Sequence, residues 1–356
     1  MAARRAELLT EIERQIDEGV YHLYGISAED RVVIGEELRS PMMADEGTGD
    51  NDIPGMAAEE FDEDACAPVI LTQYELALRW VSYAMGIVFS RFVPGVDGAL
   101  GRGQFTPDEA AALRALSHNP GLVVCEGGHS ETLPMKVRRA LEMMCGETAA
   151  QDIIDTTTGG KPLVDYLKGD FYKTHVQQYR KRPVYWLLQS PKRGYGVYVF
   201  HERMTADTLH LLRGTEYLGG AINAAHNQQA DLHSALLATP PGPARKKIEK
   251  QLDAVNALLT DLEVFDANLA AVTGATNTRG EVVGWRPELD DGVLLNLAPL
   301  HTLMPSWATE PRKAWEALAR GDYDWAHTAR RYWPDRVEEA CRHNKSFAIA
   351  HGLPTD

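Results

Sequence analysis

The spacing of apolar residues predicts helices along most of this chain. Apolar residues recur at helical intervals over 4–24, and over 244–272 they keep close to the a/d spacing of packed helices. Residues 71–92 are apolar on nearly every face, which is typical of a buried helix. The longest apolar run, 80–90, is about half of the roughly 20 residues that a membrane-spanning helix needs. We therefore expect a mainly helical chain that does not act at a membrane.

Two segments in the middle of the chain have the composition of strands. PVYWLLQS and YGVYVFHE are rich in β-branched and aromatic residues, and they flank the turn sequence PKRG. GLVVC at 121–125 is a further short strand candidate. The pattern therefore predicts an α+β fold, mainly helical, with a small antiparallel β-hairpin or sheet.

The remaining elements follow from helix starts, breaks and turns. Capping boxes are expected at Ser27 with Asp30 and at Thr106 with Glu109. Shorter helices are predicted over 131–146, 148–156 and 162–181, with a polar loop at 156–161.

Two larger features lie towards the C-terminus. Helices over 205–238 and 244–272, joined by TPPGP, predict an antiparallel helical hairpin roughly 40 Å long. Trp307, Trp315, Trp325 and Trp333 indicate a compact C-terminal helical subdomain.

These patterns divide the chain into six segments. They are N-terminal helices at 1–39, an acidic flexible loop at 40–68, a helical spacer at 69–160, a basic helix and β-hairpin at 161–204, the long helical hairpin at 205–272, and the C-terminal subdomain at 273–356.

Composition and charge exclude several classes of protein. The four cysteines form no CxxC pair and are too sparse for a disulfide framework, so we expect reduced thiols, no structural zinc and a cytoplasmic protein. The net charge of −15 argues against general nucleic-acid binding. However, ten acidic residues and no Lys or Arg lie within 40–78, which leaves −15 + 10 = −5 for the rest. The overall sign therefore does not decide the question.

The segment Phe171–Arg203, which we call the basic segment, has the opposite charge. Between Lys173 and Arg193 it carries six Lys or Arg and no acidic residue, interleaved with tyrosine, tryptophan and glutamine. One interpretation is a solvated helix end, with cations near the negative end of the helix dipole. The other is a DNA interface, where Lys and Arg contact phosphates and Gln or Tyr contact base edges. Composition leaves both open.

Motifs for catalysis are missing from the sequence. There is no nucleophile elbow, HExxH, Walker motif or dinucleotide-binding loop. Acidic clusters such as 62–64 are typical of solvated charge, so neither a catalytic residue nor a metal site is predicted.

Three long segments resemble a known family. QYRKRPVYWLLQSPKRGYGVYVFHERMTADTL, PELDDGVLLNLAPL and GDYDWAHTARRYWPDRVEEACRHNKSFAIAHGL resemble the C-terminal, target-recognition region of large adenine-specific DNA methyltransferases. These are the PglX-type enzymes of BREX and phage-growth-limitation defence, the DISARM methyltransferase and the type IIG restriction–modification enzymes. IERQIDEGVYHLYGI and RWVSYAMGIVFSRF also resemble segments of those proteins, while 40–68 matches least.

The chain departs from this family in its chemistry. The family binds S-adenosylmethionine and places an NPPY motif at the flipped adenine, whereas the one Asn-Pro here, at Asn119, continues with Gly-Leu. The resemblance therefore implies a specificity subunit without its own cofactor, either from a split gene or as a C-terminal portion. Its expected partners are double-stranded DNA, a catalytic chain that carries NPPY and S-adenosylmethionine, and other proteins of a defence complex.

Candidate DNA-contacting residues follow from residue chemistry within this resemblance. They are Lys173, Gln177, Arg180, Lys181, Arg182, Tyr185, Gln189, Lys192, Arg193, Arg330 and Arg331, with Arg336 and Arg342 as further candidates. Two alternatives remain: an assembly protein of the same complex that docks through the 205–272 hairpin, and a DNA-mimicking decoy based on the acidic 40–78 stretch.

Overall fold

The structure is a computed structural model. It describes residues 14–15, 18–23, 25–28, 30–31, 72–94, 105–117, 121–126 and 131–354. The chain divides into residues 1–72 and residues 73–356, and each part is described by itself. In the first part the capping box is confirmed, because Ser27 Oγ accepts from the Asp30 N–H at 3.1 Å and the Asp30 carboxylate accepts from the Ser27 N–H at 3.3 Å. The predicted loop at 40–68 lies outside the described residues.

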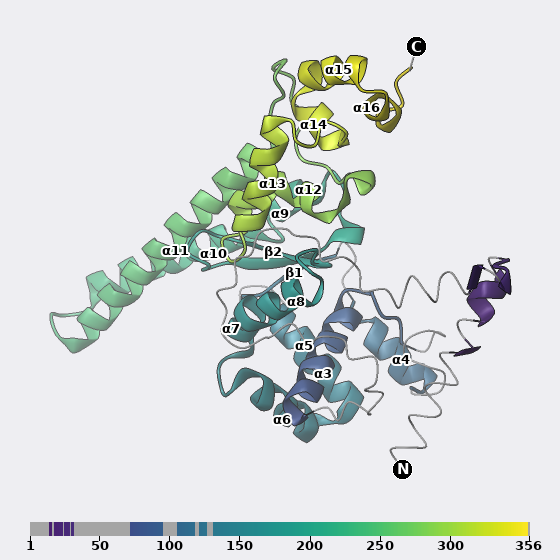
Figure 1. The fold of residues 1–356 in the computed structure, drawn as a ribbon. Helices are drawn as coiled ribbons and strands as arrows, with labels where there is room; N and C mark the ends of the chain where they lie inside the picture. Colours follow the sequence, from purple (N-terminus) through teal and green to yellow (C-terminus); the bar gives the residue numbers. More distant parts are fainter. Residues whose placement is uncertain are drawn as a thin grey trace. The chain divides into compact units, whose positions relative to one another are not determined.

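The second part begins with four helices, all in the half of Figure 1 that is coloured blue to teal. They are α3 (Gln73–Val88), α4 (Pro107–Arg114), α5 (Leu133–Cys145) and α6 (Glu147–Thr158). α3 is buried over its C-terminal half, as its apolar pattern predicts. The capping box of Thr106 and Glu109 at the start of α4 is confirmed. α6 runs on through 156–158, so the predicted loop at 156–161 begins too early.

A three-stranded antiparallel sheet forms the centre of this part. It contains β1 (Leu122–Val124), β2 (Tyr185–Gln189) and β3 (Gly196–Phe200), in the order β1-β3-β2. Tyr198 of β3 pairs with both Val123 and Leu187. Every residue of the three strands is buried, because helices cover both faces (Figure 1). Burial on both faces explains why the strands are continuously apolar and do not alternate.

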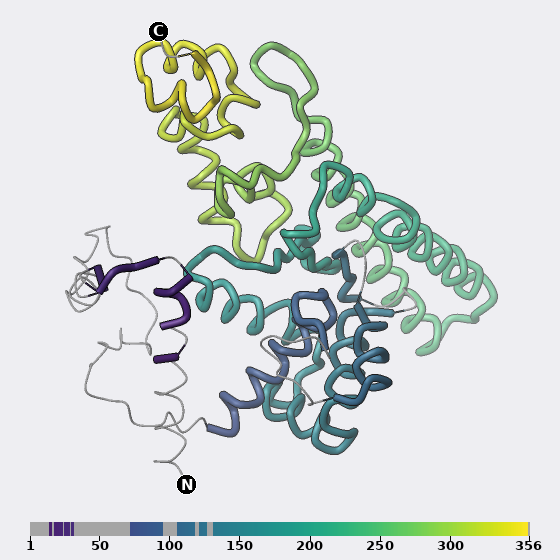
Figure 2. The backbone as a smooth tube through the Cα atoms, turned by 90° about the vertical axis from the view of Figure 1, so that its right-hand side faces the viewer, coloured from purple at the N-terminus to yellow at the C-terminus, as the bar shows by residue number. Residues whose placement is uncertain are grey.

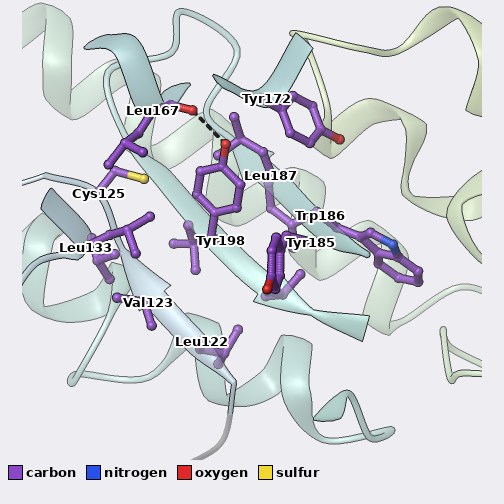
Figure 3. Packing of buried hydrophobic residues seen from close by; sticks show 14 of the residues in the cluster. Leu122, Val123, Cys125, Leu133, Leu167, Tyr172, Tyr185, Trp186, Leu187 and Tyr198 are labelled. Carbon is purple, nitrogen blue, oxygen red and sulfur yellow. Dashed lines mark hydrogen bonds between the residues drawn. The ribbon is translucent and has the colours of Figure 1, made fainter. Parts of the chain in front are cut away.

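A helical stretch with an internal π turn leads into the sheet. It consists of α7 (Leu163–Tyr166), a π-helical turn η1 (Leu167–Phe171) and α8 (Tyr172–Gln178). The helix predicted over 162–181 is therefore present as uninterrupted helical structure over 163–178 with a π turn inside it, and it ends three residues earlier than predicted. Figure 3 shows how this stretch packs on the sheet: the Tyr198 hydroxyl donates to the Leu167 carbonyl at 2.6 Å. π turns are uncommon, and they occur often at functional sites.

After the sheet come η2 (His201–Arg203), α9 (Thr208–Arg213), α10 (Leu218–Ala238) and α11 (Pro243–Thr273). The predicted helix over 205–238 is thus two helices, separated at 214–217. The antiparallel pairing of α10 and α11 is confirmed, and the two run side by side to a shared tip in Figures 1 and 2. Only Leu218 and Ala225 of α10 are fully buried, so the distal part of this pair projects as an arm.

The C-terminal part contains short helices around a second hydrophobic cluster. They are η3 (Leu289–Asp291), α12 (Gly292–Leu297), η4 (Ala298–Leu303), α13 (Thr309–Arg320), α14 (His327–Tyr332), α15 (Pro334–His343) and α16 (Lys345–Ala350). Trp315 and Trp333 pack on this cluster, whereas Trp307 packs on the larger core and Trp325 is 37% exposed. The short helices occur as predicted, but the tryptophans do not form one group, and a separate subdomain at 273–356 remains a prediction. Among the described residues, no helix combines the length and apolar character needed to cross a membrane.

The buried carboxylate of Asp261, on α11, holds the turn between β2 and β3. It accepts hydrogen bonds from the Ser190 hydroxyl at 2.5 Å, the Lys192 N–H at 2.7 Å and the Gly194 N–H at 3.1 Å. Asp261 is 3% exposed and Ser190 is fully buried, whereas Lys192 and Gly194 are exposed residues whose bonds to the carboxylate are partly buried. The contact joins the long helix to the hairpin turn and fixes where Lys192 and Arg193 lie.

We therefore predict that Asp261→Ala destabilises this part of the chain by about 2–4 kcal/mol, because it leaves the buried Ser190 hydroxyl and two partly buried N–H groups without their acceptor. Denaturant unfolding measures the loss, and hydrogen exchange of the Lys192 and Gly194 amides should accelerate. Asp253→Ala, on an exposed turn of the same helix, is the control and should change neither quantity. Unchanged amide exchange in Asp261→Ala would contradict this role.

Candidate nucleic-acid interface

The structure exposes all six cations of the basic segment, and it groups them in two turns and on one helix. Lys173 lies on α8. Arg180, Lys181 and Arg182 lie in the turn that follows α8, and Lys192 and Arg193 lie in the hairpin turn between β2 and β3. The six exposed cations are Lys173, Arg180, Lys181, Arg182, Lys192 and Arg193. Gln177, on α8, is exposed as well.

α8 ends in a Schellman motif, in which the chain reverses through left-handed backbone. The Lys181 N–H donates to the Val176 carbonyl at 2.8 Å, and the Arg180 N–H donates to the Gln177 carbonyl at 2.9 Å. Arg180 occupies the position where glycine is usual, with φ of 47°, and Lys181 follows with φ of 62°. Two cationic residues therefore have left-handed backbone, a conformation that costs free energy for any residue with a Cβ atom.

The hairpin turn repeats this feature. Arg193 has φ of 61°, and its N–H donates to the Ser190 carbonyl at 2.8 Å. A left-handed residue other than glycine costs about 1–2 kcal/mol. Three of the six cations thus occupy strained backbone, at Arg180, Lys181 and Arg193. Strain that persists at particular side chains motivates a functional hypothesis, since glycine would fold more easily there.

Most of these cations remain free for a ligand. Lys181 Nζ lies 3.2 Å from a Glu310 carboxylate oxygen, and the Arg193 guanidinium donates to the Pro305 carbonyl at 3.4 Å. Within the described part of the chain, the side chains of Lys173, Arg182 and Lys192 have no such partner, and neither has that of Arg180. Free, exposed cations of this kind can contact phosphate groups.

His175 fixes the end of α8 against the start of β2. Its Nε2 atom accepts from the N–H groups of Val184, at 3.1 Å, and Tyr185, at 3.0 Å. Burial, with a smaller contribution from the nearby Arg91 guanidinium, lowers the pKa of His175 to about 3. The imidazole is therefore neutral near pH 7, and it holds the turn at 179–183 from both sides.

The structure removes three residues from the predicted contact set. Tyr185 is 1% exposed and Gln189 is fully buried, where its side-chain oxygen accepts from Ser306; Figure 3 shows Tyr185 within the core. The Arg331 side chain is 6% exposed, and it donates to the Arg286 carbonyl at 2.9 Å. Tyr185 and Gln189 point into the protein because helices cover both faces of β2. Arg331 lies on α14, a helix whose residues Thr328, Ala329 and Tyr332 are buried. Contact by the other predicted residues remains a prediction.

The other C-terminal arginines stabilise their own subdomain. Arg336 donates to Asp324 and to the carbonyls that end α13, at Leu318 and Ala319. Arg330 donates to the His351 carbonyl at 3.2 Å. Arg342 is exposed and pairs with Glu339.

An acidic group in the same subdomain does not support a metal site. Ligand atoms of Glu288, Asp290 and His327 lie within 4.8 Å of one another. Glu288, however, also lies 3.4 Å from the Arg331 guanidinium, whose charge opposes a cation. We assign no metal to this group.

Two residues that position the interface were missed by sequence reasoning, His175 and Asp261. A single histidine in a helix carries no distinctive signal. Asp261 does carry one, since it directly precedes Leu262 within the apolar stripe of α11. A carboxylate at a buried helical position indicates a specific hydrogen-bond partner.

The lowered pKa of His175 predicts how stability depends on pH. The unfolded chain takes up this proton below its ordinary pKa of 6.5, whereas the folded chain does so only near 3. The stability that His175 contributes is therefore complete above pH 6.5 and is lost as the pH falls towards 3, by about 2 kcal/mol at pH 5. Unfolding free energies at pH 7 and pH 5 measure this loss. In His175→Gln the loss should shrink by that amount, and an equal loss in both proteins would refute the assignment.

Comparison with known proteins gives a partial similarity. Adenine-specific methyltransferase PglX of Lacticaseibacillus casei (strain Zhang) is 29% identical over 135 residues, which are 37% of this chain and 10% of that protein. Adenine-specific methyltransferase BrxX of Escherichia coli O9:H4 (strain HS) is 27% identical over 140 residues, which are 39% of this chain and 11% of that protein. No protein-family model matches. This chain is thus similar, over about a tenth of their length, to adenine-specific methyltransferases.

Proposed function

We propose that this chain is the DNA-recognition subunit of a split adenine-specific DNA methyltransferase. It acts in a bacterial phage-defence system of the BREX or DISARM kind, or in a restriction–modification system. A separate catalytic chain carries NPPY, binds S-adenosylmethionine and transfers the methyl group. The observation that carries the proposal is the placement of Arg180, Lys181 and Arg193 in left-handed backbone.

The chemistry of the interface supports DNA as the ligand. The net charge of the chain is −15, yet six exposed cations gather on α8 and on the two turns that flank β2. Lys and Arg in such turns contact phosphates, and the exposed Gln177 amide offers both a donor and an acceptor to base edges. Because His175 and Asp261 hold backbone N–H groups of the two turns, the backbone that carries these cations is fixed before DNA binds.

The sequence indicates which step of methylation belongs to this chain and which to its partner. Both relatives are named as adenine-specific methyltransferases. This chain carries no NPPY, so the adenine and the methyl donor are assigned to the partner chain. Its own residues hold and orient the duplex.

Replacing the strained cations by glycine separates stability from DNA binding. In Arg180→Gly/Arg193→Gly the backbone strain is relieved while the chain gains unfolded-state entropy, so stability should stay within about 1 kcal/mol of the wild type. DNA affinity should fall, because two phosphate contacts are lost; their loss should lower the steepness of the salt dependence by roughly 0.9 for each contact. Thermal unfolding and fluorescence anisotropy with a labelled duplex measure the two effects.

A matched variant controls for net charge. Lys246→Ala/Lys247→Ala removes two exposed cations from the distal part of α11 and should leave DNA affinity nearly unchanged. If both double variants lose the same affinity, binding depends only on total charge and the assigned interface is wrong. The same conclusion follows if the glycine variant binds DNA like the wild type.

The arm formed by α10 and α11 favours a second function, a protein that assembles the complex without reading DNA. Near its tip Leu237 is 88% exposed, and the buried residues of α10, Leu218 and Ala225, both lie in the half away from this tip. Such an exposed leucine on a projecting arm suits a protein partner.

Leu237→Lys tests this second function. Since Leu237 is exposed, the substitution should leave the thermal unfolding temperature unchanged. If the arm docks the catalytic chain, co-purification of the NPPY-carrying chain with Leu237→Lys should fall about tenfold, while duplex affinity stays unchanged. Ser234→Lys, which is also exposed on α10, shows the effect of the added charge alone. Full recovery of the catalytic chain with Leu237→Lys would exclude this site on the arm.

A further inference from the structure

A pocket of about 410 Å³ lies between α3 and α8, next to the basic turn that follows α8. This volume lies within the range of about 300–1,000 Å³ that is typical of small-molecule sites. Five of the side chains that line the pocket are aromatic. They are Tyr83, Phe92, Tyr166, Phe171 and His175.

The aromatic rings form flat walls. Tyr83 and Phe92 stack with centroids 5.4 Å apart and an interplanar angle of 25°. Phe171 stacks on His175 at 5.8 Å and 14°. Phe171 is the last residue of the π-helical turn η1, so the irregular backbone turn delivers a wall of the pocket. Flat apolar walls of this kind suit a planar ring.

The pocket also contains a hydrogen-bond donor without a partner. Because the Nε2 atom of His175 accepts two backbone N–H groups and the imidazole is neutral, the proton lies on Nδ1. No described residue accepts from Nδ1, and this atom is not among the fully buried polar atoms that lack a partner. His175 is 3% exposed and lines the pocket, so its remaining accessible surface faces this space. A ligand therefore needs an acceptor atom on a planar ring.

The cationic residues near the pocket indicate which kind of planar ring it binds. Gln178, which lines the pocket, lies two residues before Arg180, and the lining also includes one cation, Arg79, and one carboxylate, Glu75. A nucleobase combines a planar ring, acceptor atoms on its edge and an attached phosphate. A tyrosine side chain of a protein partner would supply the ring and an acceptor, but it would give the neighbouring cations no anion.

We propose that this pocket binds the base of a nucleotide, with His175 Nδ1–H donating to the base and the basic turn contacting its phosphate. This inference rests on the proposed function for its source, a base that leaves the stack of the bound DNA. The chemistry of the pocket would equally suit a free nucleotide, so the experiment separates the two sources.

The probe is 2-aminopurine, whose fluorescence is quenched when it stacks on aromatic rings. It is supplied as a free deoxynucleoside monophosphate, and within a duplex opposite an abasic site, where the base unstacks readily. The full chain should quench the duplex probe. Thr174→Trp fills the pocket from its exposed rim and should abolish the quenching. His175→Gln keeps an acceptor for the two backbone N–H groups but removes the Nδ1 donor, so it should weaken binding of the base about tenfold.

Glu263→Trp changes an exposed residue of α11 that does not line the pocket; it is the matched control and should quench like the wild type. If the free nucleotide is quenched with the same affinity as the duplex probe, the pocket binds a soluble nucleotide. The proposal that the pocket binds a base then still holds. Unchanged fluorescence of both probes overturns the proposal, as does quenching that survives Thr174→Trp. Loss of the catalytic chain from Thr174→Trp, with no quenching by the wild type, would assign the pocket to a protein side chain and also overturn it.

Duplex anisotropy, measured on the same samples, separates this proposal from the proposed function. Duplex binding without quenching rejects the base pocket alone. Quenching of the free nucleotide without duplex binding rejects the DNA-recognition role and keeps the pocket.

Discussion

One buried imidazole determines how the basic segment is presented. His175 Nε2 accepts the N–H groups of Val184 and Tyr185, so the last turn of α8 cannot move independently of β2. The turn between them, which carries Arg180 to Arg182, is therefore closed at both ends. The same two hydrogen bonds leave the proton on Nδ1 of an imidazole that lines the aromatic pocket. A rigid cationic turn and a base-sized pocket thus depend on the same side chain.

The two turns of the interface carry arginine at positions where glycine would be more stable. Glycine would suit the backbone at Arg180 and Arg193, yet arginine is present at both. The surrounding structure offsets this strain, through His175 at one turn and the Asp261 carboxylate at the other. Since these anchors are buried and the cations are exposed, substitutions at the anchors should affect folding first, while substitutions at the cations should affect ligand binding first.

The sequence predicts the parts of this structure that depend on local patterns. The two strands at 185–189 and 196–200, the paired helices α10 and α11, and the capping box at Thr106 follow from residue spacing and turn chemistry. The break between α9 and α10 and the π turn do not, because tertiary packing decides them. The sequence also does not predict which strand residues are buried, because a hairpin pattern does not show that helices cover both faces. The sequence therefore places Tyr185 and Gln189 on the surface, whereas both are buried.

The most direct test of the DNA-recognition account is the affinity of the full wild-type chain for duplex DNA as a function of salt. Phosphate contacts from all six exposed cations predict that the logarithm of the association constant falls linearly with the logarithm of salt concentration, with a slope of roughly −5. The acidic net charge of −15 would oppose such binding in the absence of a dedicated cationic surface. No measurable duplex binding at low salt, or binding without salt dependence, would contradict the account.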